Sequence, residues 1–384
     1  MWIVGHPDDP TPYEFSRYLV EPDLIVLTDV PSRVVSLVDE SRKPGARVEV
    51  RNTDDYEALS QDLTGGEGFD DIVVLDPRSA AQMGAIANHI AFRGTMNLVG
   101  RKPLDGPASI DLGRIHYHYT AYLGNAGPDI AASYGEARNR CELRPQGVAV
   151  FVGAGGPMGQ MHIQRALELD EGPRTLLAVD RDQARLSILM ERLAPLATSK
   201  GRQLLAVDSS SDPGRADEAI REATAGRGAD DVIVTVPVAT VMAEASSLMA
   251  PDGMLVLFAG VPNGTFGPLD LSQVYLHGAQ FTGTSGSRIV DQQRVLEKAA
   301  KGKLSLEASL AAVGGIEAAR DGLQALMEGR FAGKIVIFPQ LTGLPLLELA
   351  ELAVKHPGIG ALMDEGHSWT RAAEAMLFET FWKS

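Results

Sequence analysis

Residues 150–159 form the stretch Val150-Phe151-Val152-Gly153-Ala154-Gly155-Gly156-Pro157-Met158-Gly159, around which the rest of the chain is organised. An apolar run ends in a glycine-rich turn, a helical pattern follows, and a second apolar run ends in Asp180. A strand, a tight turn, a helix and a strand that ends in an acid form the first βαβ unit of a dinucleotide-binding fold. Glycines let the backbone approach a pyrophosphate, and a carboxylate can accept hydrogen bonds from a ribose diol.

The spacing of these glycines departs from the usual G-x-G-x-x-G pattern. Gly153, Gly155 and Gly159 give G-x-G-x-x-x-G, unless the motif begins at Ala154. An ordinary structural turn is the alternative, but the strand before the turn, the helix after it and the later acid favour nucleotide binding. We therefore expect a pyrophosphate-binding turn and leave the role of each glycine open.

Bulk composition excludes several classes of function. The chain has 384 residues, 45% of them hydrophobic, and a formal net charge of −15, without a cluster of Lys and Arg. Nucleic acids and anionic membranes need a basic face, so neither is an expected partner. No apolar run approaches the ~20 residues that cross a bilayer, and the apolar start is too short for a signal peptide, so we expect a cytoplasmic protein. Cys141 is the only cysteine, which excludes an intrachain disulfide and a thiolate-rich zinc site.

The sequence contains an internal repeat. Thr64 to Val74 matches Thr224 to Val234 at an offset of 160, and Tyr122 to Gly127 matches Phe281 to Gly286 at an offset of 159, with further matches between them. The predicted fold class is α/β, with two tandem Rossmann-like doubly wound parallel-sheet domains and a C-terminal helical tail. We place the domains at residues 1–145, 146–340 and 341–384, with Arg140 to Gly147 as the joint between the copies.

Local patterns outside the central unit predict further elements. The expected strands are Met1 to Gly5, Leu24 to Asp29 and Gly333 to Phe338, and the expected helices are Tyr13 to Val20, Ile316 to Met327, Leu344 to Val354 and Trp369 to Trp382. The last helix carries an apolar stripe at helical spacing, which indicates a core or dimer face rather than a membrane anchor.

The two copies differ where a cofactor would bind. In the first copy, Gly5 is followed by residues 6–12, in which prolines without N–H donors and the carboxylates of Asp8 and Asp9 replace the glycines. We expect no dinucleotide in this loop, because the carboxylates would repel a pyrophosphate. His6, Asp8 and Asp9 form either a solvated loop, the commoner case, or a metal site.

Six motifs of the second copy carry a family resemblance: Gly155 to Gly159, Val179 to Leu186, Gly228 to Val232, Gly253 to Gly260, Gly283 to Gly286 and Gly333 to Ile337. In these motifs the chain resembles the medium-chain (zinc-type) alcohol dehydrogenase family, within it the branch of sorbitol and L-sorbose-1-phosphate dehydrogenases. The resemblance implies an NAD(P)-dependent oxidoreductase that passes hydride between the nicotinamide and the carbinol carbon of an alcohol, polyol, sugar or sugar phosphate.

The resemblance also implies which residues bind the cofactor. They are Gly153, Gly155, Gly156, Pro157, Met158 and Gly159 at the pyrophosphate, Asp180 and Arg181 at the ribose, and Thr235, Val236, Pro237, Phe258, Ala259, Gly260, Val261, Thr284 and Ser285 along the nicotinamide. Asp180 favours NAD because a carboxylate repels a 2′-phosphate, whereas the adjacent Arg181 keeps NADP open.

The chain departs from the family at the catalytic domain. A second βαβ copy replaces the zinc-binding barrel domain that precedes the nucleotide domain in the family, and the sequence has no Gly-His-Glu tripeptide. We therefore expect no zinc and assign no catalytic residue. His116 and His118 form an H-x-H on an expected strand, with His277 matching His118 in the second copy. A structural role for these histidines is commoner than a catalytic or metal-binding one.

These features leave two main hypotheses open. The chain is an oxidoreductase, with its catalytic domain supplied by a separate chain, or a non-catalytic NAD(H)-binding regulatory module. The family pairs its nucleotide domains edge to edge, so the fused copy can act as an internal pseudo-dimer partner, with a homo-oligomer as the other arrangement. A purely structural protein is disfavoured, because a scaffold has no need of the glycine turn and Asp180 in one copy only.

Overall fold

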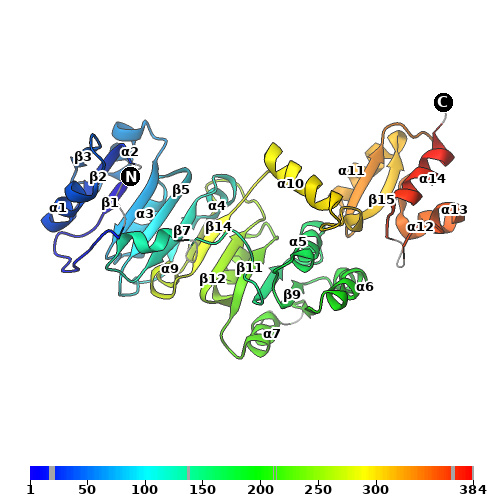
Figure 1. Ribbon diagram of the computed structural model, residues 1–384, viewed down its shortest axis with the longest axis horizontal. Helices are drawn as coiled ribbons and strands as arrows, with labels where there is room; N and C mark the ends of the chain where they lie inside the picture. Colours follow the sequence, from blue (N-terminus) through cyan, green and yellow to red (C-terminus); the bar gives the residue numbers. More distant parts are fainter. Residues whose placement is uncertain (17–21, 136–138, 211, 213, 365–367, 383–384) are drawn as a thin grey trace. The chain divides into compact units, whose positions relative to one another are not determined.

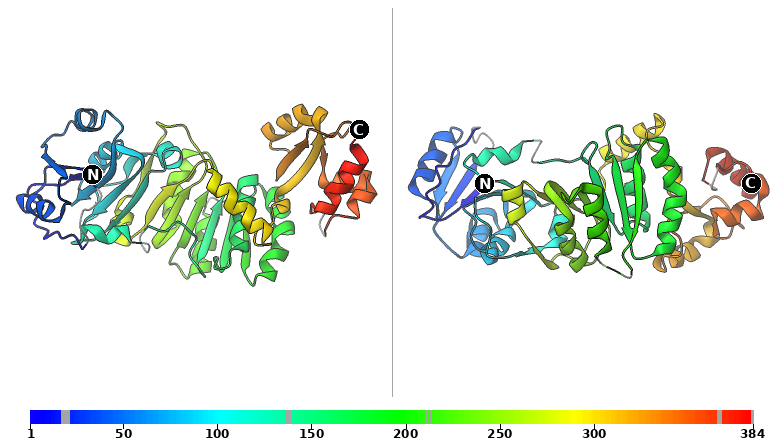
Figure 2. Two further views of the ribbon diagram at one scale, coloured as in Figure 1. Left: turned by 45° about the horizontal axis from the view of Figure 1, so that its top comes forward. Right: turned by 90° about the horizontal axis from the view of Figure 1, so that it is seen from below.

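The computed structural model describes residues 1–16, 22–135, 139–210, 212, 214–364 and 368–382. These residues form two compact units, Met1–Val152 with Asp217–Gly286, and Gly153–Ala216 with Ser287–Ser384. Their helices and strands are drawn in Figure 1 and Figure 2. The α/β class expected from the sequence is confirmed, whereas the domain boundaries at 1–145, 146–340 and 341–384 stay a prediction.

The first unit contains the whole amino-terminal copy as a parallel sheet. Its strands are β1 (Trp2–Val4), β2 (Leu24–Thr28), β3 (Arg47–Val50), β4 (Phe69–Leu75), β5 (Ile90–Val99) and β7 (Ala121–Asn125). They lie in the order β7-β5-β4-β1-β2-β3, which is the doubly wound order with its switch point between β1 and β4. Their side chains are mostly buried, because apolar helix faces such as Val34 and Val38 of α1 (Ser32–Ser41) cover the sheet.

The second copy contributes four strands to the same unit. These are β8 (Val148–Val152), β11 (Ala229–Val234), β12 (Met249–Leu257) and β14 (Gln280–Gly283), parallel and in the order β8-β11-β12-β14. The helical segments of the first unit are α1 (Ser32–Ser41), α2 (Tyr56–Thr64), α3 (Ala80–Ala87), α4 (Leu112–Tyr117), η1 (Ile130–Tyr134), most of α7 (Arg215–Thr224), α8 (Ala239–Glu244), η2 (Ala245–Leu248) and α9 (Ser272–His277).

The repeated letters fold into the same local structure. Before β4 and before β11, a threonine hydroxyl accepts the backbone N–H of a glycine four residues on, Thr64 from Gly68 at 3.0 Å and Thr224 from Gly228 at 3.1 Å. Both glycines have a left-handed backbone, with φ of 84° and 92°. An added Cβ would lie 2.5 Å from a backbone oxygen at Gly68 and 2.6 Å from one at Gly228, so the turn requires glycine in both copies.

The two copies join edge to edge within the first unit. Strand β14 pairs antiparallel with β7 through Phe281 and Tyr122, and β13 (Phe266–Leu269) pairs antiparallel with β6 (Ala108–Asp111), with Pro268 opposite Ser109. Each of these pairs joins residues 159 apart, which is the offset of the repeat. Only these two residue pairs join repeat equivalents, and the flanking pairs of β13 and β6 are offset to either side of 159, as around the two-fold axis of an isologous dimer interface.

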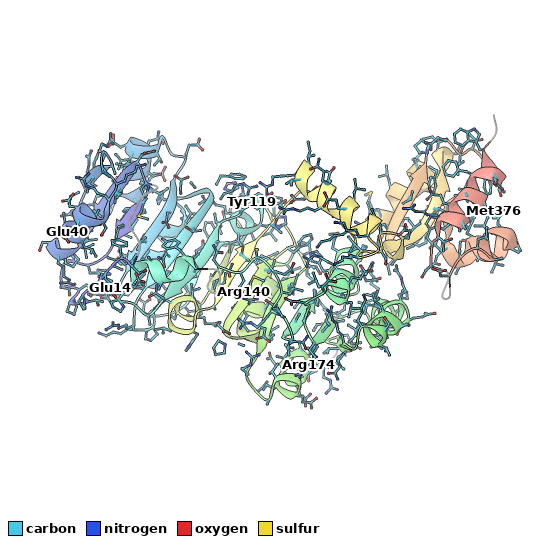
Figure 3. The ribbon with its side chains drawn as sticks, viewed as in Figure 1. Glu14, Glu40, Tyr119, Arg140, Arg174 and Met376 are labelled. Atoms are coloured by element: carbon cyan, nitrogen blue, oxygen red, sulfur yellow. The ribbon has the colours of Figure 1, made fainter. Side chains whose placement is uncertain are left out.

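The segment between the copies is tied to β11. Arg140, labelled in Figure 3, donates from Nη1 to Oδ1 of Asp231 at 2.8 Å. The backbone N–H of Arg144 donates to the other oxygen of this carboxylate at 2.7 Å. Asp231 is fully buried, so these hydrogen bonds compensate the cost of removing its charge from water.

The second unit combines two small sheets with helices. Its strands are β9 (Thr175–Asp180), β10 (Gln203–Asp208), β15 (Leu310–Gly315), β16 (Lys334–Phe338) and β17 (Leu347–Glu348). Its helical segments are α5 (Pro157–Glu168), α6 (Gln183–Ser199), α10 (Ile289–Ala300), η3 (Glu307–Ser309), η4 (Ile316–Ala318), α11 (Ala319–Met327), α12 (Leu349–Lys355), α13 (Pro357–Gly360) and α14 (Arg371–Phe381). Strands β9 and β10 are parallel, and β15 lies between parallel β16 and antiparallel β17.

Most local expectations are confirmed. The three expected strands form β1, β2 and β16, and the helices expected from Ile316 and from Trp369 are present as η4 with α11 and as α14. The helix expected from Leu344 begins only at Leu349, because Leu347 and Glu348 pair with β15. Of the helix expected from Tyr13 to Val20, residues 17–20 lie outside the described residues, and Glu14 forms an isolated bridge with Asp129 instead of a helical turn.

The apolar stripe of the last helix belongs to a core. Trp369, Ala373 and Leu377 are buried in one cluster with Leu341 and Leu352. Across the ranges that the structure describes, every helix is too short or too polar to span a bilayer.

Candidate functional site

The glycine turn of the second unit wraps around the end of β9. The backbone N–H groups of Gly153 and Ala154 both donate to the carbonyl of Val179, at 2.9 and 3.0 Å, and Gly153 has a φ of 84°. A Cβ on Gly155 would lie 2.7 Å from Cβ of Arg185, and one on Gly159 would lie 2.5 Å from the carbonyl oxygen of Gly153. Gly153 thus makes the tight turn, while Gly155 and Gly159 allow close packing, which the sequence had left open.

Helix α5 begins directly after this turn. Pro157 is its first residue, Gly156 precedes it, and no side chain caps its amino end. The first N–H groups of the helix, at Met158 and Gly159, therefore remain available to an anion, and the helix dipole favours negative charge there.

Asp180 is fixed at the end of β9 by three backbone donors. Its Oδ2 accepts the N–H of Gly155 at 2.8 Å, and its Oδ1 accepts those of Arg181 at 2.7 Å and Asp182 at 3.0 Å. The carboxylate is only half-buried, so its remaining lone pairs can accept hydroxyl groups. Arg181 is exposed beside it.

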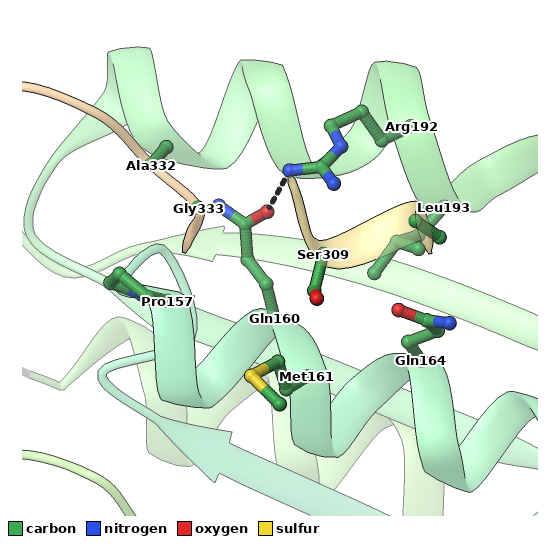
Figure 4. Close-up of a pocket in the computed structure, with 10 residues that line it drawn as sticks. Pro157, Gln160, Met161, Gln164, Arg192, Leu193, Ser309, Ala332 and Gly333 are labelled. Atoms are coloured by element: carbon green, nitrogen blue, oxygen red, sulfur yellow. Dashed lines mark hydrogen bonds between the residues drawn. The ribbon is translucent and has the colours of Figure 1, made fainter. Parts of the chain in front are cut away.

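A small cavity lies between α5, α6 and residues 308–309 and 332–333 (Figure 4). Gln160 spans it, because its Nε2 donates to the carbonyl of Gly155 at 3.0 Å and its Oε1 accepts Nη1 of Arg192 at 3.0 Å. Gln160 and Arg192 therefore link the glycine turn to α6. Their role was missed at the sequence level, because the contact joins two helices.

The remaining cofactor candidates lie in the first unit, at the carboxyl ends of three adjacent parallel strands. Thr235, Val236 and Pro237 follow β11, residues 258–261 follow β12, and Thr284 and Ser285 follow β14. The hydroxyl and the N–H of Thr235 both donate to the carbonyl of Val152 at 2.9 Å. Ligands of open α/β sheets bind at the carboxyl ends of the strands, so this arrangement suits residues that contact a nicotinamide. That these residues bind the nicotinamide stays a prediction.

Side chains of the first copy lie against the carboxyl-terminal edge of the strands of the second copy. An added Cβ at Gly260 would lie 2.4 Å from the hydroxyl oxygen of Tyr117 and 2.9 Å from Cδ2 of His116. His116 is buried, with Nδ1 3.3 Å from the carbonyl oxygen of Leu257 and its ring edge-on to Phe258. Burial lowers the pKa of His116, which favours the neutral imidazole.

The expectation of a strand at His116 to Tyr119 was wrong. Residues 112–117 form α4, capped by Asp111, whose carboxylate accepts the N–H groups of Gly113 and Arg114 at 3.0 and 3.3 Å. The two imidazoles consequently have different neighbours. His118 contacts Nε of Arg114 at 3.3 Å and the amide of Asn263 at 3.0 Å, and burial together with Arg114 lowers its pKa. His277 ends α9 and is exposed.

The loop after β1 gives no support to a metal site. Asp8 pairs with Arg78 at 3.0 Å, and Asp9 is 1% exposed with Oδ1 accepting the N–H of Thr11 at 2.9 Å. The description of this loop as solvated was thus wrong for Asp9. Among the described residues, no group of three or more His, Cys, Asp or Glu side chains is placed to hold a metal ion.

Comparison with known proteins adds the relatives of this fold. Residues 157–301 match the family model described as zinc-binding dehydrogenase. An uncharacterized Escherichia coli protein, YggP, is 29% identical over 289 residues, covering 72% of this chain and 64% of its own length. Mannitol-1-phosphate 5-dehydrogenase of Aliivibrio fischeri is 28% identical over 289 residues, with the same coverage. L-sorbose 1-phosphate reductase of Klebsiella pneumoniae is 28% identical over 242 residues, covering 61% of this chain and 55% of its own length.

These matches show sequence similarity to zinc-binding dehydrogenases over residues 157–301 and to two curated sugar- and polyol-phosphate oxidoreductases over a longer stretch. The chain is a relative of the medium-chain alcohol dehydrogenases, as the sequence motifs predicted. It spans 55% to 64% of the length of these three curated relatives.

Proposed function

We propose that the chain is an NAD-dependent oxidoreductase that transfers hydride between the nicotinamide and a carbinol carbon of a polyol or sugar, free or phosphorylated. The observation that carries this proposal is the glycine turn, docked on β9 and hydrogen-bonded to Asp180. The names of two relatives, a mannitol-1-phosphate dehydrogenase and an L-sorbose 1-phosphate reductase, support the substrate class.

The residues present fit the adenine half of the cofactor. The uncapped amino end of α5 offers N–H groups to a pyrophosphate, and Gly155 and Gly159 keep the backbone free of side chains that would block its approach. Asp180 can accept both hydroxyls of a ribose. When bound, the nicotinamide supplies the hydride chemistry, and the protein supplies orientation and electrostatics.

Asp180 favours NAD over NADP. Its carboxylate, held in place by three backbone N–H groups, would lie beside a 2′-phosphate and repel it. Arg181 is exposed and adjacent in the chain, so it offers a positive charge that could accept the 2′-phosphate of NADP. We therefore propose NAD as the preferred cofactor and NADP as the weaker one.

Alcohol oxidation also needs a group that takes the hydroxyl proton. Burial lowers the pKa of His116 and so favours its neutral form, and its imidazole lies against Gly260, beside the residues proposed for the nicotinamide. A catalytic domain supplied by a separate cytoplasmic chain is a second source of such a proton acceptor. If neither operates, the chain is the NAD(H)-binding regulatory module of the alternative hypothesis.

Calorimetric titration of NAD, NADH and NADP into the chain and into Asp180→Asn tests the cofactor proposal. We expect the variant to bind NAD at least ~10-fold more weakly, about 1.4 kcal/mol, because the charge-assisted hydrogen bonds to the ribose are lost. Its preference for NAD over NADP should shrink at the same time, since the repulsion of a 2′-phosphate is removed.

Asp208→Asn is the matched control. Asp208 ends β10 in register with Asp180 and accepts the N–H of Ser210 at 2.8 Å, so the variant removes an equivalent charge from the neighbouring strand end. It should bind NAD as the unmodified chain does. Absence of NAD and NADH binding to the unmodified chain, or equal affinity in Asp180→Asn, would overturn the cofactor site.

Turnover separates the two hypotheses. We expect the purified chain, alone or with a zinc-barrel chain added, to reduce NAD with mannitol 1-phosphate. If NAD binds tightly and neither mixture shows turnover, the regulatory module becomes the better description.

A further inference from the structure

Because β7 and β14 pair antiparallel, part of the first copy lies beside the carboxyl ends of the strands of the second copy. Because β7 and β14 run in opposite directions, the residues that precede β7 lie beside the residues that follow β14. Tyr119, labelled in Figure 3, lies just before β7, and its hydroxyl donates to the carbonyl of Ser285. The first copy thus reaches the loop that is proposed to lie along the nicotinamide.

Arg93 lies on this contact as an exposed cation. Its guanidinium carbon is 4.4 Å from the ring centre of Tyr119 and 5.5 Å from that of Phe92, and the two rings pack edge to face at 5.6 Å. Its backbone N–H donates to the carbonyl of His118 at 2.7 Å. Over the described ranges no carboxylate pairs with Arg93, although the protein carries a net charge of −15.

The backbone at Arg93 is unfavourable for arginine. Its φ is 65°, in the left-handed region where glycine, asparagine and aspartate are preferred. A long side chain at such a position raises the conformational energy of the backbone, and residues of this kind are found both in tight turns and at functional sites.

The repeat provides an internal comparison. The equivalent position in the second copy is Asp252, which has a similar φ of 58° and pairs with Nη1 of Arg144 at 3.2 Å. The equivalents of Phe92 and Tyr119 are Pro251 and Gly278, which have no aromatic ring. The same backbone position therefore carries Asp252, paired with an arginine, in the second copy. In the first copy it carries Arg93, which no carboxylate pairs with among the described residues and which packs on two aromatic rings.

The charged groups around Arg93 leave the site positive. Arg114 donates to the carbonyls of Asn88 and Ile90 and to Nδ1 of His118, none of which is a carboxylate. The carboxylate of Asp111 is occupied by the N–H groups at the start of α4 and by that of Gly264 at 2.8 Å. The carboxylate of Asp111 is therefore engaged by backbone N–H groups, and Arg114 adds a second positive charge that no carboxylate pairs with among the described residues.

We propose that Arg93 anchors the phosphate group of a phosphorylated polyol or sugar beside Ser285, with Tyr119 and Phe92 holding its guanidinium in place. This inference rests on the proposed function, because it places the carbinol end of the substrate at the nicotinamide. A guanidinium can donate two parallel hydrogen bonds to a phosphate, and stacking on aromatic rings fixes its plane. The anchor then selects phosphorylated substrates over free ones.

Arg93→Gly tests the anchor without endangering the fold, because glycine adopts positive φ at no steric cost. Binding of mannitol 1-phosphate and of mannitol is measured by calorimetry, with the chain saturated with NADH so that no hydride transfer can occur. We expect the unmodified chain to bind mannitol 1-phosphate at least ~10-fold more tightly than mannitol. Arg93→Gly should lose this preference while its affinities for NAD and for mannitol stay unchanged.

Arg101→Gln is the matched control, since Arg101 is an exposed arginine just beyond the opposite end of β5 and donates to the carbonyl of Ala126 at 3.1 Å. It should keep the preference. Equal binding of mannitol 1-phosphate and mannitol to the unmodified chain, or an unchanged preference in Arg93→Gly, would overturn the anchor. If neither NAD nor NADH binds, the proposed function fails separately, and the same comparison without cofactor decides on the phosphate site.

Discussion

Gly159 lies within α5, where replacing glycine by alanine normally stabilises a helix by about 1 kcal/mol. At this position an added Cβ would lie 2.5 Å from the carbonyl oxygen of Gly153 and 2.6 Å from Cα of Ala154, both rigid backbone atoms. We expect Gly159→Ala to lower the free energy of unfolding by roughly 1–3 kcal/mol and to weaken NAD binding. Urea unfolding and calorimetry measure the two effects.

Gly358→Ala is the control at the same scale. Gly358 lies in α13, and nothing would lie within 4 Å of its added Cβ. This variant should be neutral or slightly stabilising. If both variants behaved alike, the close packing of α5 against the turn would have no energetic consequence.

The sequence predicts residues of this kind only where the signal is local. The turn, the helix and Asp180 follow one another along the chain, so their order alone indicates the site. Arg93 was missed because its partners, Tyr119 and Ser285, come from other parts of the chain. That Arg93 is unusual at this position follows only from the structure, which shows a positive φ at both Arg93 and its repeat equivalent Asp252.

At the scale of elements, the error at His116 to Tyr119 has a physical cause. Alternating histidine and tyrosine matches the period of a strand, yet Asp111 is an N-cap and starts a helix. Asp111 could have been recognised as a helix N-cap from the sequence, but the alternation over residues 116–119 was given more weight and led to the prediction of a strand. The helix expected from Leu344 is shorter than predicted for a similar reason, because pairing of β17 with β15 takes precedence over the local helical pattern.

Asp71 and Asp231 occupy equivalent positions on β4 and β11 but are compensated differently. Asp231 pairs with Arg140 at 2.8 Å, whereas Asp71 accepts the hydroxyls of Tyr134 at 2.8 Å and Thr95 at 3.1 Å. We expect Asp231→Asn to cost about 3 kcal/mol, because it leaves a guanidinium without its counter-charge. Asp71→Asn should not destabilise the fold at pH 7. Urea unfolding of both variants makes the comparison.

The pH dependence of stability provides a separate check on Asp71. Burial raises the pKa of Asp71 in the folded state above its ordinary value of 3.8, so the folded protein retains a proton that the unfolded chain has lost. The contribution of Asp71 to stability is thus present below pH 3.8 and declines as pH rises through the raised pKa. In Asp71→Asn this decline should disappear. A decline of equal size in the variant would show that other groups cause it.

At the scale of the whole molecule, the repeat could be recognised from letters, because matched segments recur in the same order at offsets of 159 and 160. The way in which the copies join could not be derived in the same way. Pairing of β7 with β14 depends on two edges that are far apart in the chain, and no local pattern specifies whether they run parallel or antiparallel. The antiparallel choice is what places Arg93 and His116 beside the second copy.

Phe281 and Tyr122 are the pair at the centre of this joint, and Phe281 is fully buried. We expect Phe281→Ala to lower the free energy of unfolding by about 3–5 kcal/mol, because removing its buried ring leaves a large cavity at the joint between β14 and β7. The two copies should then unfold in separate thermal transitions rather than one, since the strands that couple them pack poorly. Phe266→Ala, in the neighbouring β13 with a side chain 49% exposed, should cost less than about 1 kcal/mol. A single unchanged transition in Phe281→Ala would mean that the copies are not coupled through this edge.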